Sequence, residues 1–80
     1  MKAKVYITLK KGVLDPQGKA VMGALGTMGY REVKDVRVGK FMEIEVDSPS
    51  RQKAEERLKE MCEKLLANTV IEDYRFEILP

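Results

Sequence analysis

The sequence contains no histidine and no tryptophan, and its only cysteine is Cys62. Without histidine the chain lacks the commonest general base and the commonest metal ligand. A single cysteine can form neither an internal disulfide nor a CxxC metal pair, which indicates a reducing environment. These absences argue against catalytic triads, zinc sites and a disulfide scaffold. We therefore expect no catalytic residue, no metal site and no cofactor in this chain.

An excess of charge of one sign is also missing. The 15 basic and 13 acidic side chains leave a net charge of +2, whereas a nucleic-acid-binding domain usually carries a strong basic field. No run of about 18 apolar residues and no signal-peptide pattern occurs. Low-complexity tracts, long linkers and internal repeats are absent too. We expect a single cytoplasmic domain over residues 1–80 that binds neither nucleic acid nor a membrane.

Strand and helix patterns fill most of the chain. Apolar and polar side chains alternate near residues 3–10, 33–39, 40–47 and 70–79, which predicts four strands. Apolar stripes of helical spacing predict helices near 16–28 and 49–67. Asp15-Pro16 and Ser48-Pro49 suit helix starts, because a side-chain oxygen can accept free amides and proline needs no partner there. Gly29 and Asn68 suit the two helix ends.

The element order βαββαβ predicts an α+β two-layer sandwich of the ferredoxin-like kind. Its four-stranded antiparallel sheet should carry both helices on one face. The helix residues expected against the sheet are Ala20, Val21, Ala24, Leu25 and Met28 in the first helix, and Ala54, Leu58, Met61, Cys62 and Leu65 in the second. Tyr6 and Phe41 should lie on the uncovered face of the central strands. We predict a homodimer interface at Tyr6 and Phe41, or pairing of an exposed strand edge.

Few side chains remain as candidates for chemistry. Cys62 lies on the apolar stripe of the second helix, which favours a small buried hydrophobe over a nucleophile. Glu43 and Glu45 share a strand face, as a carboxylate pair could, but solvated faces often carry such pairs. The same carboxylates disfavour an RNA-binding role for Tyr6 and Phe41 as stacking platforms. The glycines match neither the GxxxxGK[ST] motif nor the GxGxxG motif, so the sequence gives only weak support for a phosphate-binding loop.

Three long segments resemble the PurS family: KKGVLDPQGKAV at 10–21, DVRVGK at 35–40 and EMCEKLLANTVIEDYRFE at 60–77. PurS is the small subunit of phosphoribosylformylglycinamidine (FGAM) synthase in de novo purine biosynthesis. The resemblance implies a subunit without its own active site that forms a homodimer or higher homo-oligomer. It also implies two partners, a glutaminase subunit (PurQ) and a large ATP-dependent synthetase subunit (PurL). The complex passes ammonia from glutamine to formylglycinamide ribonucleotide (FGAR) and forms FGAM.

On this resemblance, the loop after the first strand is expected to contact a partner subunit. Gly12 permits an unusual turn, and Val13 and Leu14 can present apolar side chains from the loop. Asp15 fixes the helix start beside them. The predicted partner-binding residues are Gly12, Val13, Leu14, Asp15, Arg37 and Lys40. The alternative is that this loop only packs onto the sheet edge.

Two other functions suit the same fold. A dimeric regulatory domain that senses a small molecule would need a polar pocket at its dimer seam. An acylphosphatase-like enzyme would need an arginine in a phosphate-cradling loop after the first strand. Residues 10–17 contain no arginine, so the acylphosphatase interpretation is disfavoured.

Overall fold

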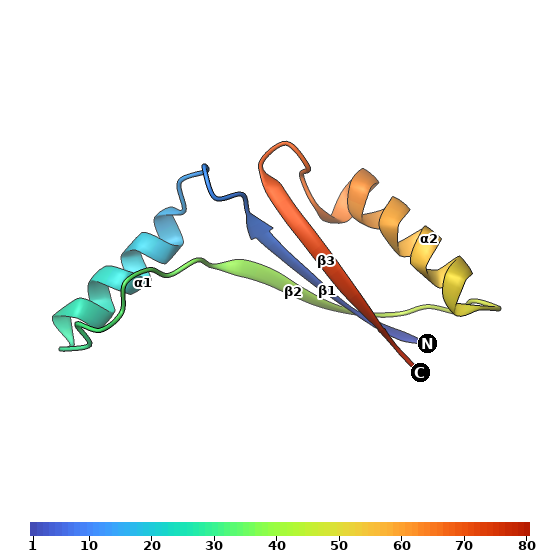
Figure 1. Cartoon of the computed structure of the whole chain (residues 1–80), viewed down its shortest axis with the longest axis horizontal. Coiled ribbons are helices and arrows are strands. Elements are labelled where there is room, and N and C mark those ends of the chain that lie inside the picture. Colours follow the sequence, from blue (N-terminus) through green and yellow to red (C-terminus); the bar gives the residue numbers. More distant parts are fainter.

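The computed structural model describes residues 1–80. Its elements, in chain order, are β1 (Lys2–Leu9), α1 (Pro16–Thr27), β2 (Gly39–Glu45), α2 (Arg51–Met61), η1 (Cys62–Leu66) and β3 (Glu72–Leu79), as Figure 1 shows. The short π-helix η1 directly continues α2. The expected α+β class, with two helical regions and an antiparallel sheet, is confirmed.

The sheet has three strands in the order β2-β1-β3, and both pairings are antiparallel. Val5 at the centre of β1 lies opposite Met42 on one side and Phe76 on the other. Tyr6, the next residue, lies opposite Phe41 and Arg75 on the other face. The alternation predicted for these three strands therefore sorts their side chains correctly onto two faces.

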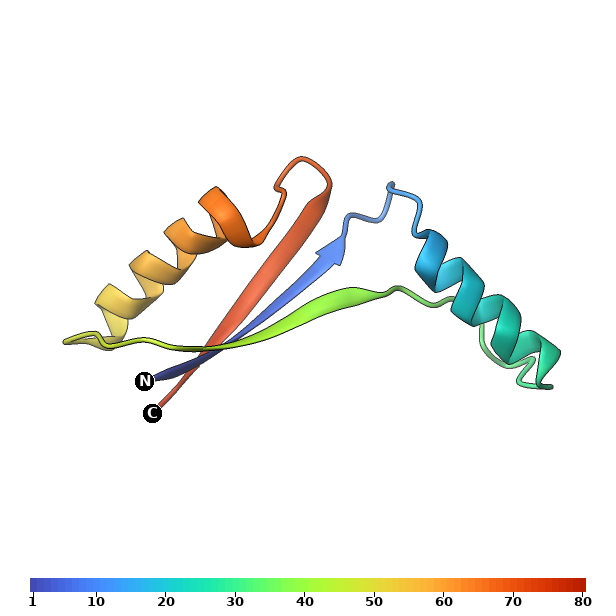
Figure 2. The ribbon, with the colours of Figure 1, turned by 180° about the vertical axis from the view of Figure 1, so that it is seen from behind.

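The predicted fourth strand, 33–39, is wrong as a sheet strand. Only Gly39 belongs to β2, and residues 33–38 are extended without strand pairing. They run beside α1 on the way back to the sheet (Figures 1 and 2). Alternation predicts an extended backbone, but a strand also needs a neighbouring backbone to pair with. Residues 33–38 have no such neighbour within this chain.

The prediction that both helices cover one sheet face is also wrong. Only α2 packs on the sheet, while α1 projects from the other end of the molecule (Figures 1 and 2). The chain measures 51 × 27 × 14 Å, and its radius of gyration is 16.0 Å. A compact chain of this length would have a radius of gyration of about 12 Å. The isolated chain is therefore extended and leaves most of α1 in solvent.

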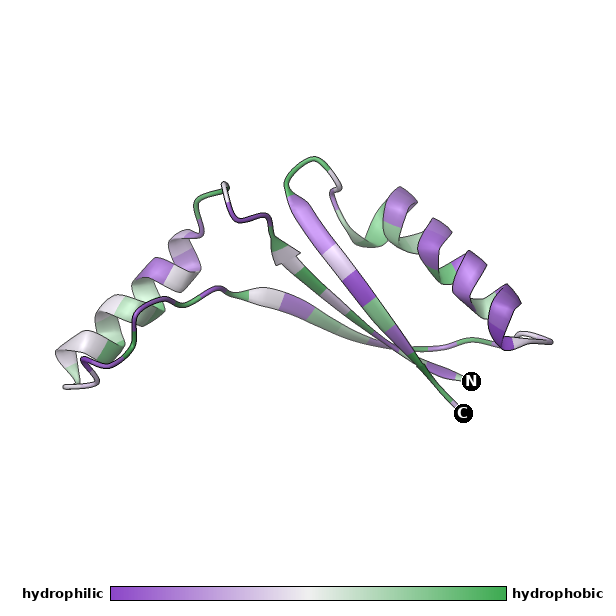
Figure 3. Cartoon of the chain, viewed as in Figure 1, coloured by the Kyte–Doolittle hydropathy of each residue, from purple (hydrophilic) through white to green (hydrophobic).

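The core lies between the sheet and α2. Its fully buried side chains include Val5 and Ile7 from β1, Leu58 from α2 and Cys62 at the start of η1. Figure 3 shows hydrophilic and hydrophobic residues alternating along β3 and around α2, so each element turns its apolar side inward. Burying aliphatic side chains of this size stabilises the fold by about 1.5–3 kcal/mol each.

The second helix differs from its prediction at both ends. It begins at Arg51, and the Ser50 hydroxyl accepts the Lys53 N–H at 3.1 Å, so Ser50 is the N-cap instead of Ser48. At the other end Met61 is 36% exposed and Leu65 is 82% exposed, although both were expected in the core. The π-helical turn widens the helix there and moves Leu65 out of the apolar stripe. Leu66 packs against the core in its place.

Candidate functional site

The predicted partner-binding residues gather where α1 meets the sheet. We call residues 9–18 and 36–40 the junction. Asp15 links its two chain segments, because Oδ1 accepts the Gly18 N–H at 2.9 Å and Oδ2 accepts the Val38 N–H at 2.7 Å. The first bond caps α1, as predicted from Asp15-Pro16. Since Asp15 is only 3% exposed, it supports the junction from within instead of offering a contact surface.

Arg37 holds the loop between β1 and α1. Its Nη2 atom donates to the carbonyl oxygens of Leu9 at 3.3 Å, Lys10 at 2.9 Å and Val13 at 3.0 Å. A charged donor gives stronger hydrogen bonds than a neutral one. The Lys10 carbonyl also accepts the Val13 N–H at 2.9 Å, so Arg37 reinforces a turn that the backbone already makes. The structure thus brings Arg37 onto the predicted loop, but the side chain fixes the loop's shape.

Leu14 is the most prominent apolar side chain of the junction. It is 69% exposed, whereas Val13 is half-buried and Gly12 is exposed with open space around it. A large exposed aliphatic side chain on a loop held by Arg37 and Asp15 has the character expected of a preformed contact point. Leu14 is therefore the residue of the predicted set best placed to touch another molecule.

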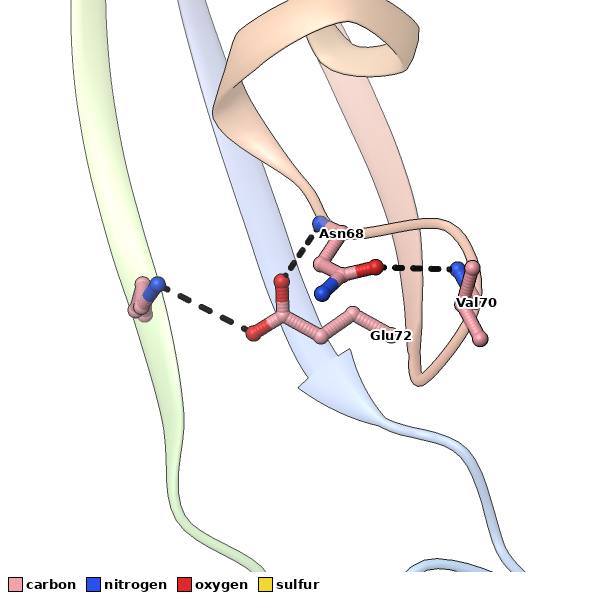
Figure 4. A network of polar contacts seen from close by, with 4 residues as sticks. Asn68, Val70 and Glu72 are labelled. Atoms are coloured by element: carbon pink, nitrogen blue, oxygen red, sulfur yellow. Dashed lines mark hydrogen bonds and ion pairs between the residues drawn. The ribbon is translucent and has the colours of Figure 1, made fainter.

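Lys40 lies at the start of β2 and takes part in a separate network. Its Nζ is 3.8 Å from Glu72 Oε2 at the start of β3 (Figure 4). The other carboxylate oxygen of Glu72 accepts the Asn68 N–H at 2.7 Å, and Asn68 Oδ1 accepts the Val70 N–H at 3.2 Å. Asn68 thus organises the turn after η1, and Lys40 links β2 to that turn.

Two glycines that sequence reasoning did not assign to the site are required for close backbone approach. A Cβ atom on Gly18 would lie 2.1 Å from the Val36 carbonyl oxygen, and one on Gly39 would lie 2.3 Å from the Ile7 carbonyl oxygen. Such distances are far inside van der Waals contact. The sequence signal for Gly18 is its position three residues after Asp15, where the capping carboxylate binds an amide. Gly39 carries no comparable local signal.

The hydrogen bonds at Asp15 make the junction sensitive to acid. The bond from Gly18, then that from Val38, lowers the pKa of Asp15 below its ordinary value of 3.8, while burial opposes them and Arg37 reinforces them. A carboxyl group with a lower pKa in the folded state stabilises folding above its unfolded pKa. That stabilisation is lost as the pH falls through the lowered folded value.

Asp15→Asn should therefore flatten the acid side of the stability profile. The amide keeps one acceptor for Gly18 but turns an NH₂ group toward the Val38 N–H, so the variant should be less stable at pH 7. It should also lose less stability than the wild type between pH 7 and pH 3. Urea unfolding at several pH values measures both differences. Equal losses in the two proteins would show that the carboxylate does not stabilise the junction.

Tyr6 and Phe41 lie together on the uncovered sheet face, as predicted. Their ring centroids are 5.2 Å apart, and the Arg75 guanidinium carbon lies 3.9 Å from the Tyr6 ring centroid. The same face carries ion pairs, including Lys2 with Glu43 at 3.2 Å. Glu43 therefore pairs with a lysine. Whether Tyr6 and Phe41 form a dimer interface stays a prediction.

Cys62 is completely buried against the sheet. Burial raises the pKa of its thiol, and the nearby Glu63 carboxylate raises it further, so the reactive thiolate is disfavoured.

We expect a thiol reagent to label Cys62 in the native chain only as fast as the chain unfolds. Cys62→Ala should lower the free energy of unfolding by about 1 kcal/mol through lost packing. Rapid labelling of the folded chain would show that Cys62 is an accessible nucleophile.

No group of three or more histidine, cysteine, aspartate or glutamate side chains is placed to hold a metal ion. Neither helix has the length and apolar character needed to cross a lipid bilayer. The three-stranded antiparallel sheet, its single covering helix and the projecting α1 define an extended α+β protein. Hydrogen bonds hold the junction between its two ends.

Comparison with known proteins gives the family. Residues 2–80 match the PurS family model, described as phosphoribosylformylglycinamidine (FGAM) synthase. The chain belongs to the PurS family. It is 60% identical over 77 residues to the phosphoribosylformylglycinamidine synthase subunit PurS of Bacillus subtilis, covering 96% of this chain and 90% of that protein. The corresponding protein of Archaeoglobus fulgidus is 50% identical over 74 residues and 92% of each chain.

Solved structures share the fold as well as the sequence. A crystal structure of B. subtilis PurS superposes with a TM-score of 0.88 at 58% identity, over 99% of this chain and 98% of that one. A chain of the PurLQS structure from Thermotoga maritima superposes with a TM-score of 0.90 at 33% identity, over 98% and 95%. These superpositions cover nearly the whole chain, so they include α1 as well as the sheet. The two solved structures therefore share the extended shape of this chain.

Proposed function

We propose that this chain is the PurS subunit of a cytoplasmic FGAM synthase. In this role it joins the glutaminase subunit PurQ to the synthetase subunit PurL and assists ammonia transfer during the ATP- and glutamine-dependent conversion of FGAR to FGAM. The observation that carries the proposal is the match over residues 2–80 to the PurS family. The likeness to a chain of the T. maritima PurLQS structure supports an assembly of the same kind.

The proposed contribution of the chain is a docking surface. Leu14 would insert into an apolar site on a partner subunit, and Gly12 and Val13 would let the two backbones approach. Asp15 and Arg37 act as positioning residues, since their hydrogen bonds fix the loop before a partner arrives. A loop that is already ordered loses little conformational entropy on binding, and this favours association. Lys40 would serve at the edge of the same surface.

Self-association is the second part of the proposal. Only 10 of the 80 residues are buried, and α1 has almost no contact with the sheet. A chain with so small a core gains stability when apolar surface is buried between copies. We propose a homodimer as the smallest assembly that satisfies this need.

The proposed role predicts that the chain is catalytically silent alone. The purified protein should hydrolyse neither glutamine nor ATP, because catalysis is assigned to PurQ and PurL. Mixed with those two subunits, it should elute with them as one complex in size-exclusion chromatography. Turnover that persists through rigorous purification would contradict the assignment, and so would failure to co-elute under turnover conditions.

A further inference from the structure

The turn between η1 and β3 presents a second exposed apolar side chain at the end of the sheet where Leu14 lies. Val70 is 80% exposed and lies in the bend of this turn (Figure 4). The Lys10 N–H donates to the Ile71 carbonyl oxygen at 2.9 Å, so the turn is bonded directly to the loop between β1 and α1. Both ribbon views show the loop and the turn at the same end of the sheet (Figures 1 and 2). Leu14 and Val70 therefore belong to neighbouring segments.

Hydrogen bonds fix the shape of this turn. Asn68 Oδ1 accepts the Val70 N–H at 3.2 Å, and the Glu72 carboxylate accepts the Asn68 N–H at 2.7 Å. The Asn68 carbonyl oxygen accepts the amides of Ile71 at 3.0 Å and Glu72 at 2.7 Å. A side chain on such a turn is in place before anything binds, which lowers the entropic cost of association. One exposed apolar side chain is ordinary on a protein surface, but two on adjacent, ordered segments form a candidate contact surface.

The unpaired charges on these two segments have one sign. Residues 9–14 include Lys10 and Lys11 and no acidic side chain, and residues 67–71 carry no charge. Neither lysine forms an ion pair within the chain, whereas the nearby Glu72 already has a lysine partner. A complementary partner face combines an apolar hollow with carboxylates at its rim. Pairing this surface with the same surface of a second copy would place lysines against lysines, which is unfavourable.

We propose that Leu14 and Val70 dock together on one face of another FGAM synthase subunit, in an apolar hollow bordered by carboxylates. This inference rests on the proposed function, because it takes the chain to be part of such an assembly. The likeness to a chain of the PurLQS structure supports a partner subunit as the occupant. The partner-binding surface thus extends beyond the predicted loop to a turn that is distant in the sequence.

Two neutral substitutions in the turn test the contact. Val70→Asn places a polar group in the proposed apolar hollow, and Thr69→Asn is the control at the adjacent exposed, polar residue. The dissociation constant of each variant for purified PurQ and PurL is measured by titration, with circular dichroism as the folding check. Val70→Asn should raise it roughly 10-fold or more, and Thr69→Asn should leave it nearly unchanged. If Val70→Asn does not fold, Val70→Thr preserves the shape of the side chain and should raise it by a few-fold.

The lysines provide an independent measurement. Lys11→Gln removes one unpaired cation and leaves both apolar side chains intact. The dissociation constant should rise roughly 3-fold at low salt, and it should depend less on salt concentration than that of the wild type. Equal salt dependence of the two proteins would overturn the proposed carboxylate rim.

Photo-crosslinking in the assembled complex identifies the occupant. Leu14→Cys and Val70→Cys each supply an attachment point for a crosslinking reagent, and the native Cys62 is buried. Both positions should crosslink to the same partner subunit. Crosslinks to two different subunits, or from position 70 to a second copy of this chain, would overturn the proposal.

Binding by the wild-type chain separates this inference from the proposed function. If the wild type binds PurQ and PurL and Val70→Asn binds equally well, the inference fails and the subunit role stands. If the wild type does not bind them, the proposed function fails and this inference fails with it.

Discussion

Leu14→Asp is expected to abolish most of the glutamine-dependent FGAM formation of the reconstituted complex and to leave the chain folded. Leu14 is 69% exposed, so little packing is lost in the isolated chain. An exposed loop substitution of this kind changes stability by less than about 0.5 kcal/mol. In a desolvated apolar contact, the same carboxylate would cost a few kcal/mol of association, roughly 100-fold in affinity.

The glutamine-dependent and ammonia-dependent rates should be measured side by side. The first reaction needs PurQ docked and its ammonia delivered, so it should fail before the second. Leu65→Asp is a suitable control, because Leu65 is 82% exposed and belongs to η1, outside the predicted partner-binding loop. If the Leu14→Asp variant folds and both reactions run at the normal rate, the loop does not contact a partner subunit. It then only packs onto the sheet edge of its own chain.

Gly18→Ala and Gly23→Ala are expected to change stability in opposite directions, although both lie in α1. The added methyl group at Gly18 would meet the Val36 carbonyl at 2.1 Å, whereas nothing lies within 4 Å of a Cβ at Gly23. Overpacking against backbone costs about 1–3 kcal/mol. At Gly23 the helix preference of alanine should add up to about 1 kcal/mol. Gly18→Ala should also loosen α1 from residues 33–38 and weaken any contact that depends on its position.

Thermal and urea unfolding of the two variants measure these changes. A melting temperature above that of the wild type for Gly23→Ala, and below it for Gly18→Ala, would support the described junction. Equal stabilisation of both variants would mean that α1 does not rest on the Val36 backbone in solution.

Local signals made most elements predictable from the sequence. Asp15 caps α1 as expected, and Gly29, the only residue with positive φ at +100°, ends it. The Tyr30 N–H bonds to the Leu25 carbonyl and the Gly29 N–H to that of Gly26, the pattern of a Schellman C-cap. Such motifs involve neighbours a few residues apart, so the sequence carries them directly.

Features that depend on distant backbone were not predictable. Leu65 lies outside the predicted apolar stripe because the helix ends in a π-helical turn. The sequence has no clear pattern that predicts such a turn. The strand expected near 33–39 has the right alternation but no partner strand within the chain. The placement of α1 depends on bonds across 23 and 24 residues, from Val38 to Asp15 and from Arg37 to Val13. Periodicity does not report contacts of that kind.

The structure brings the predicted partner-binding residues of the loop together, but it gives them different surroundings. Sequence reasoning grouped Asp15 and Arg37 with Leu14 as contact residues. The structure separates them, since Asp15 is buried and Arg37 is bonded to three carbonyls, while Leu14 faces solvent. The residue types alone cannot distinguish a charged side chain that binds a partner from one that holds its own loop.

The most direct test of the central claim is FGAM formation by purified PurQ and PurL with and without this chain. Glutamine, ATP and FGAR should yield FGAM at a substantial rate only when the chain is present, with the rate rising to a plateau as it is titrated to a fixed ratio. Ammonia-dependent formation should be much less affected by its omission. A full glutamine-dependent rate without the chain, or no increase on adding it, would contradict its assignment as the bridging subunit.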